Sequence, residues 1–203
     1  MSAHPGVRPP KRPDGWQAPG PRPRAPADLL PDTDEDLCLL CGDFRIFQKR
    51  QGHRWSLDDL VTAWVARRTM TATPPTDVLD LGCGIGSVAL LVAWSFPDAR
   101  VTGIEAQDVS LSLARRSVRW DGVDDRVTLV HGDLRDAATL PDTARFDLIT
   151  GTPPYFIHGT ALESDKVQCG PCRFEYRGGP EDYARAAARW LRPTGRFVLC
   201  VSV

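Results

Sequence analysis

Short apolar runs alternate with amphipathic stretches from Asp77 to the end of the chain. The apolar runs predict buried strands, and stretches in which apolar residues recur every three or four positions predict helices. The strands are expected at 78–81, 101–105, 127–131, 146–150 and 197–201, with helices at 88–95, 107–120 and 181–191. Because strands that alternate with helices form parallel sheets covered on both faces, the pattern predicts an α/β fold with a mostly parallel sheet.

The segment before this sheet has a different pattern. Residues 44–49 alternate weakly between apolar and polar and predict a strand, which residues 53–55 could follow as the returning strand. Ser56 is expected to cap a helix that runs to about Thr69, because an acid stands three positions after it as in a capping box. Apolar residues recur at helical spacing in this helix, namely Leu57, Leu60, Val61, Trp64 and Val65.

The first 31 residues hold nine of the eighteen prolines. Proline lacks a backbone N–H and fixes φ, and this region has few large apolar residues, so we predict a disordered, extended tail. The acidic run 32–36 is expected to be a solvated linker. The predicted division is therefore tail and linker at 1–36 and a folded domain at 37–203. The tail either aids solubility or makes a weak electrostatic contact with RNA through its five basic residues.

Composition and charge restrict the class of protein. The 203 residues are 42% hydrophobic and 25% charged, as in globular domains, and the net charge of −1 gives no overall attraction to nucleic acid or membrane. We find no apolar run of about 18 residues and no secretory signal, so we expect a cytoplasmic protein with no membrane partner. The cysteines are then expected to be thiols. The oligomeric state stays open.

The chain stops at Val203, inside or just after the fifth predicted strand. A doubly wound sheet usually has its far edge covered or paired, so we expect a domain that is short at its C-terminus. It could be a fragment, a truncated product or a protein without the usual last strands.

A glycine-rich turn follows the first predicted strand of the sheet. It contains Asp80, Gly82, Gly84 and Gly86, and glycines at such a turn let backbone N–H groups approach a ligand closely. Glu105 ends the next strand, where its carboxylate can accept hydrogen bonds from two ribose hydroxyls. The spacing matches the dinucleotide fingerprint of nicotinamide cofactors but does not by itself settle the cofactor, and a tight turn without ligand is a further possibility.

A second motif follows the fourth predicted strand, at the edge where open α/β sheets bind ligands. It consists of Thr152, Pro153, Pro154 and Tyr155. Two prolines stiffen the backbone and leave a carbonyl free to accept a hydrogen bond from an amino group. Tyr155 offers a flat face on which a base can stack, although a packed tyrosine in a stiff loop is the simpler alternative.

Together these motifs resemble class I S-adenosylmethionine-dependent methyltransferases. The Pro-Pro-Tyr sequence is similar to motif IV of the amino-methyltransferases, and the chain from Phe44 to Val203 resembles the small-domain family of bacterial tRNA adenine-N6 methyltransferases. The resemblance implies a Rossmann-like fold with S-adenosyl-L-methionine as the cofactor. It implies that Asp80 and the glycines hold the methionine end of the cofactor and that Asp133 faces its adenine, although Asp133 could also be a helix N-cap. By the same analogy Ser56 and Asp58 line the cofactor site, although a simple capped helix is the alternative.

In that family the residue before the two prolines is Asn or Asp, and it holds the target nitrogen together with a proline carbonyl. Here it is Thr152, which offers one hydroxyl oxygen on a shorter side chain. Either this hydroxyl still accepts, or the carbonyl of Pro153 does most of the positioning, or activity is altered or lost. We expect methylation of an adenine amino group in structured RNA such as tRNA. The alternatives are a protein glutamine amide and a non-catalytic cofactor-binding module.

Two Cys-x-x-Cys pairs, 38–41 and 169–172, could form a shared zinc site or a redox dithiol. Neither has the flanking pattern that such chemistry requires, and we expect no metal. The long connection 156–179 is predicted to be a lid or binding loop. Its basic residues are interleaved with aromatic ones, which suits a nucleic-acid strand, and a solvated loop is the alternative.

Overall fold

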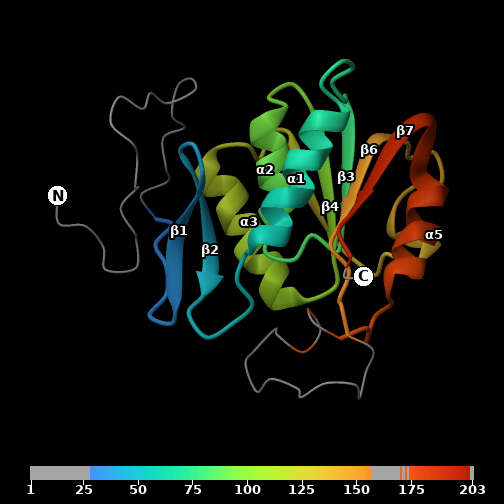
Figure 1. The fold of residues 1–203 in the computed structure, drawn as a ribbon. Helices are drawn as coiled ribbons and strands as arrows, with labels where there is room; N and C mark the ends of the chain where they lie inside the picture. Colours follow the sequence, from blue (N-terminus) through green and yellow to red (C-terminus); the bar gives the residue numbers. More distant parts are fainter. Residues whose placement is uncertain (1–27, 157–169, 171, 173, 202–203) are drawn as a thin grey trace.

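The computed structural model describes residues 28–156, 170, 172 and 174–201, and its centre is a five-stranded sheet (Figure 1). The strands lie in the order β5-β4-β3-β6-β7, and every neighbouring pair is parallel. They are β3 (Asp77–Leu81), β4 (Arg100–Glu105), β5 (Val127–His131), β6 (Phe146–Gly151) and β7 (Leu191–Leu199). The predicted parallel α/β sheet is confirmed.

Helices cover both faces of this sheet (Figure 1). One face packs against α1 (Leu57–Thr69), α2 (Ser87–Ser95) and α3 (Asp108–Asp121), and the other packs against α5 (Pro180–Trp190). Successive residues of a strand point to opposite faces, and in β3 Val78 belongs to the first core and Leu79 to the second. The central strand therefore carries apolar residues on both sides, which is why it is mostly apolar in the sequence, with the buried Asp80 as an exception.

A two-stranded antiparallel hairpin precedes the sheet, and it differs from the predicted one. Strand β2 (Phe44–Lys49) pairs with β1 (Glu35–Cys41), which comes before it, and not with residues 53–55, which form no strand. The hairpin is held on α3, where the backbone N–H of Phe47 donates to Ser117 Oγ at 2.9 Å and that of Arg45 donates to Asp121 at 2.8 Å.

The acidic run 32–36 is not a solvated linker throughout, and the folded region starts before residue 37. Glu35 and Asp36 begin β1 and are each only 2% exposed. Glu35 can be buried because its carboxylate pairs with Arg116 at 2.6 Å and Lys49 at 3.1 Å. The predicted tail also ends earlier than residue 31, since Leu29 packs in the core. Residues 1–27, with all five basic residues of the tail, lie outside the described residues.

Helix α1 begins as predicted, but four of the five residues of its apolar row are exposed, and Val65 alone of the five packs against the core. Leu57 is 68% exposed and Trp64 is 55% exposed. The side that packs against the protein carries Ala63 and Ala66, whose small side chains let α1 lie close to α2. Arg68 covers the ring of Trp64, with 4.9 Å between the guanidinium carbon and the ring centroid.

None of the helices in the described part of the chain is both long and apolar enough to cross a bilayer.

Candidate active site

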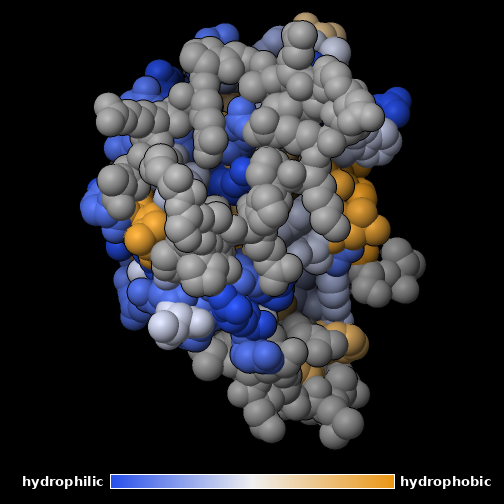
Figure 2. Space-filling model, turned by 90° about the vertical axis from the view of Figure 1, so that its left-hand side faces the viewer, coloured by the Kyte–Doolittle hydropathy of each residue, from blue (hydrophilic) through white to orange (hydrophobic). Residues whose placement is uncertain are grey.

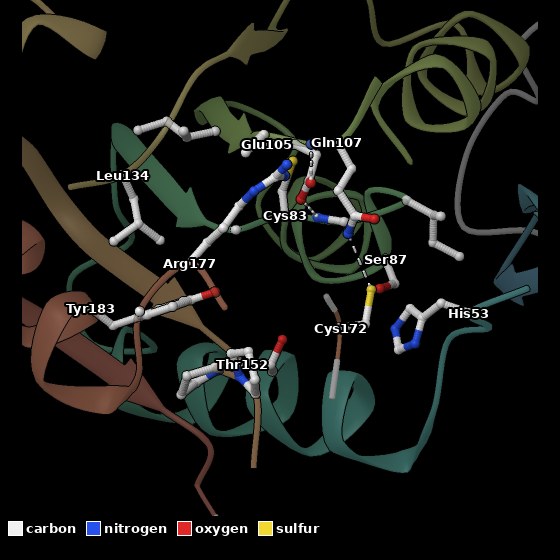
Figure 3. Close-up of a pocket in the computed structure, with 18 of the residues that line it drawn as sticks. His53, Cys83, Ser87, Glu105, Gln107, Leu134, Thr152, Cys172, Arg177 and Tyr183 are labelled. Carbon is white, nitrogen blue, oxygen red and sulfur yellow. Dashed lines mark hydrogen bonds between the residues drawn. The ribbon is translucent and has the colours of Figure 1, made fainter. Parts of the chain in front are cut away.

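A pocket opens at the carboxyl ends of β3, β4 and β6, where parallel sheets commonly bind ligands (Figure 3). Most of the predicted site residues line it: Ser56, Asp58, Gly82, Gly84, Glu105, Asp133, Thr152, Pro153, Pro154 and Tyr155. The two predicted residues that do not line it are Asp80 and Gly86. The tertiary fold therefore brings the glycine turn and the Pro-Pro-Tyr loop, which are separated by some 70 residues, to one cavity.

The glycine turn connects β3 to α2 through three residues with positive φ: +60° at Gly82, +56° at Gly84 and +88° at Gly86. An L side chain would be strained at each of them. A Cβ atom on Gly84 would meet nothing within 4 Å, so this part of the backbone faces open space beside the pocket. A Cβ on Gly86 would lie 3.2 Å from that of Ala114 in α3. Gly86 thus allows α2 and α3 to pack closely, at the N-cap position of α2.

Asp80 lies beneath the turn and not in the pocket wall. Its side chain is 2% exposed, and Oδ1 accepts a hydrogen bond from the hydroxyl of Thr150 at 2.7 Å. Oδ2 is buried without a hydrogen-bond partner among the described residues. Burial, with a contribution from the nearby carboxyl of Asp59, raises the pKa of Asp80 to about 7. Asp80 is therefore positioned to stabilise the glycine turn from the interior of the protein.

Glu105 stands at the end of β4, and each of its carboxylate oxygens accepts a backbone N–H. Oε2 accepts the N–H of Gly84 at 2.9 Å, and Oε1 accepts the N–H of Gln107 at 2.6 Å. Burial raises the pKa of this carboxyl above its ordinary value, although these backbone hydrogen bonds oppose the rise. Arg177 extends toward it across the pocket (Figure 3). The carboxylate is therefore fixed at the position predicted for contact with a ribose.

Asp133, which follows β5, is held by a neighbouring arginine. Arg135 donates to it from Nη2 at 2.6 Å and from Nε at 3.0 Å. This hydrogen-bonded pair holds the pKa of Asp133 below its usual value, so the group is a carboxylate at neutral pH. The alternative role as a helix N-cap is wrong, because Asp136 caps the short helix η1 (Ala137–Thr139).

The start of α1 and the Pro-Pro-Tyr loop are joined by a hydrogen bond. The hydroxyl of Tyr155 donates to Asp58 Oδ2 at 2.8 Å. The tyrosine side chain is 37% exposed, so part of the ring is available to a ligand while its outer end is fixed. Ser56 begins α1 with the predicted capping box, in which its backbone N–H donates to Asp59 at 2.8 Å.

Sequence reasoning missed several pocket residues. Gln107 lines the pocket next to Cys172, and its Nε2 donates to the Cys172 sulfur at 3.5 Å. Tyr183 reaches the pocket from α5, on the opposite face of the sheet from α1. The position of Gln107, just after Glu105, was a usable signal, whereas nothing local marks Tyr183. The cysteine pairs are divided: Cys38 and Cys41 belong to β1, Cys172 lines the pocket, and Cys169 lies outside the described residues.

The predominant charge of the pocket is negative. Among the described residues, four carboxyl groups line it, from Asp58, Asp59, Glu105 and Asp133, against one arginine, Arg177. S-adenosylmethionine carries a positive sulfonium and an ammonium group, and its ribose hydroxyls need acceptors such as Glu105. The donor and acceptor set therefore fits this cofactor, with the glycine turn and Glu105 as the residues that would hold it.

Comparison with known proteins agrees with this geometry. Residues 78–169 match the family model described as a methyltransferase domain. The crystal structure of an S-adenosylmethionine-dependent methyltransferase from Agrobacterium tumefaciens has the same fold, with a TM-score of 0.62 at 18% identity over 89% of this chain and 56% of that one. Residues 78–169 thus match a methyltransferase domain, and the described part of the chain has the fold of S-adenosylmethionine-dependent methyltransferases.

Two groups of curated methyltransferases are similar to this chain over more than half of its length. The tRNA1(Val) (adenine(37)-N6)-methyltransferase of Porphyromonas gingivalis is 34% identical over 142 residues, which cover 69% of this chain and 54% of that protein. The ribosomal protein uL3 glutamine methyltransferase of Bradyrhizobium diazoefficiens is 46% identical over 128 residues, which cover 60% of this chain and 39% of that protein. The chain thus spans about half the length of its curated relatives, or less.

Proposed function

We propose that the chain transfers a methyl group from S-adenosylmethionine to the amino group of adenine in structured RNA such as tRNA. The observation that carries this proposal is the shared pocket of the Pro-Pro-Tyr loop and the glycine turn. A methyl donor held at the turn and an amino group held at the loop would meet in one cavity. The cytoplasm, where tRNA is found, is the compartment that this proposal implies.

The loop supplies what an amino group needs. The half-exposed ring of Tyr155 is available for stacking with a base, and its hydrogen bond to Asp58 restricts the ring to one orientation. The hydroxyl of Thr152 and the carbonyl of Pro153 are acceptors for the two amino hydrogens. S-adenosylmethionine, when bound, supplies a methyl group that is already electrophilic. The main contribution of the protein is then to hold the nitrogen in line with that methyl group.

The test measures the transfer of a labelled methyl group from S-adenosylmethionine to the RNA fraction and to the protein fraction of a cell extract. The extract comes from cells that lack the protein. We expect the label in tRNA, as N6-methyladenine after digestion to nucleosides. A chain that binds the cofactor in calorimetry and labels no RNA would refute the RNA proposal. Tyr155→Ala is the matched variant: it should abolish labelling of RNA while cofactor binding persists, because Tyr155 belongs to the acceptor side of the pocket.

A protein glutamine amide is the second candidate acceptor, since the more identical of the two relatives above carries the name of a glutamine methyltransferase. The amide nitrogen is planar and has two hydrogens, as the adenine amino group has, so the same loop can hold it. The protein fraction of the same extract distinguishes them, because label that is sensitive to protease and not to ribonuclease identifies this substrate.

The non-catalytic alternative is tested by Thr152→Asn, which restores the amide carbonyl of the family motif. Activity that appears only in the variant would show that the native chain binds the cofactor without using it. Equal or higher activity of the native chain would show that the Thr152 hydroxyl or the Pro153 carbonyl is sufficient.

A further inference from the structure

Tyr183 occupies a space that two glycines leave free. It stands on α5, and its side chain crosses the ends of β3 and β6 beside the pocket. A Cβ on Gly151 would lie 2.7 Å from the ring atom Cδ1, and a Cβ on Gly82 would collide with the hydroxyl oxygen. Gly151 has no positive φ, so the close approach of this ring, and not backbone strain, accounts for glycine at that position.

The hydroxyl of Tyr183 has no partner in the described part of the protein. The residue is 6% exposed, and no hydrogen bond joins its hydroxyl to another described residue. Figure 3 shows the oxygen directed into the pocket, on the side of Arg177 and Leu134. The polar atom of a largely buried side chain is normally hydrogen-bonded, and this one opens into the pocket without a partner among the described residues, so it is available to a ligand.

The surroundings keep this hydroxyl protonated. Burial raises its pKa above the ordinary value, and the negative charges of Glu105 and Asp80 raise it further. A neutral phenol can both donate and accept, but the carboxyl groups around the pocket already provide acceptors. Tyr183 therefore adds a hydrogen-bond donor to a pocket in which carboxyl groups are the main charged groups.

We propose that Tyr183 is a cofactor-binding residue whose hydroxyl donates a hydrogen bond to an oxygen of bound S-adenosylmethionine. The acceptor is either the carboxylate of the methionine end or a ribose hydroxyl. The proposal concerns the cofactor alone, so it does not depend on whether the acceptor of the methyl group is RNA or protein. The oxygen of Tyr183 lies over Gly82, at the start of the turn that also contains Gly84 and leads to the contact with Glu105.

The experiment is calorimetric titration of the full chain with S-adenosylhomocysteine, for the native protein, Tyr183→Phe and the control Tyr176→Phe. Phenylalanine keeps the ring between the two glycines and removes only the hydroxyl. We expect the affinity of Tyr183→Phe to fall about tenfold, the value of one lost hydrogen bond in a buried site. Tyr176 is 38% exposed and does not line the pocket, so its variant should bind within twofold of the native chain.

A second ligand, 5′-methylthioadenosine, keeps the ribose and adenine but lacks the carboxylate. If the tenfold loss appears with both ligands, the acceptor is a ribose oxygen, and if it appears with S-adenosylhomocysteine alone, the acceptor is the carboxylate. Equal affinity of Tyr183→Phe and the native chain for S-adenosylhomocysteine, with thermal unfolding unchanged, would overturn the proposal. Absence of binding to the native chain would also overturn it, whereas binding without methyl transfer counts only against the proposed function.

Discussion

Replacement of Asp80 by asparagine should make the protein more resistant to unfolding at high pH relative to the native chain. Burial raises the pKa of this carboxyl from 3.8 to about 7 in the folded protein. In the unfolded chain the group ionises at its ordinary value. The native chain therefore loses stability as the pH rises from about 4 to about 7, because ionisation is penalised only in the folded state. Asparagine has nearly the same shape and can still accept the hydrogen bond from Thr150.

The magnitude follows from the two pKa values. At pH 5 the folded carboxyl is still protonated, whereas at pH 8 it is ionised, and each pKa unit crossed costs about 1.4 kcal/mol. Between these two pH values the native chain should lose about 2.5 kcal/mol of its free energy of unfolding through Asp80. The asparagine variant lacks this loss. Any cost of burying the asparagine NH2 group is the same at both pH values and cancels in the difference.

The assay is urea unfolding at pH 5 and pH 8 without cofactor, followed by the fluorescence of the six tryptophans. The control is Asp124→Asn, at an exposed carboxyl outside the pocket. The difference in unfolding free energy between Asp80→Asn and the native chain should grow by about 2.5 kcal/mol from pH 5 to pH 8, and the control should show no such growth. A difference that stays constant within about 0.5 kcal/mol would refute the claim that Asp80 is protonated in the fold.

Three further changes test other parts of the structure. Tyr155→Phe loses the hydrogen bond to Asp58 and should raise KM for the proposed RNA substrate about fivefold, while the affinity for S-adenosylhomocysteine stays within twofold; an unchanged KM would show that the bond does not orient the ring. Gly151→Ala places a methyl group against the Tyr183 ring and should cost about 1–3 kcal/mol in urea unfolding, and a loss below about 0.5 kcal/mol would contradict the close packing of this ring. Leu57→Lys should change stability by less than about 0.5 kcal/mol, because this leucine is 68% exposed, and a loss above 2 kcal/mol would contradict the outward orientation of the α1 row.

Local patterns in the sequence predicted the main sheet because each element carries its own signal. A strand such as β3 is buried on both faces and is therefore mostly apolar, with Val78, Leu79 and Leu81. The glycine turn was predictable because positive φ favours glycine whatever surrounds it. Ser56 and its acid three positions later form a cap within a single turn of helix. In each case the residues that interact are neighbours in the sequence.

The predictions from sequence were wrong where a local pattern was compatible with more than one packing partner in the fold. Weak alternation in 44–49 indicated a strand, but β1 and not 53–55 pairs with it. The acidic appearance of Glu35 suggested solvent, yet a cation from α3, Arg116, lies against it. The apolar spacing of α1 correctly showed which residues share one face of the helix. The opposite face is the buried one, because its small residues Ala63 and Ala66 allow α1 to approach α2 closely. Spacing shows which residues share a face, not which face meets another element.

The sequence alone determined the α/β sheet, the glycine turn and the stiff Pro-Pro-Tyr loop, since each depends on short-range backbone preferences. Only the tertiary structure determined that Tyr155 is tied to Asp58, that Asp80 supports the turn from beneath and that Tyr183 enters from α5. These contacts join residues far apart in the chain. The physical reason is that their energy depends on the distances set by packing the helices on the sheet, which no local pattern of residues encodes.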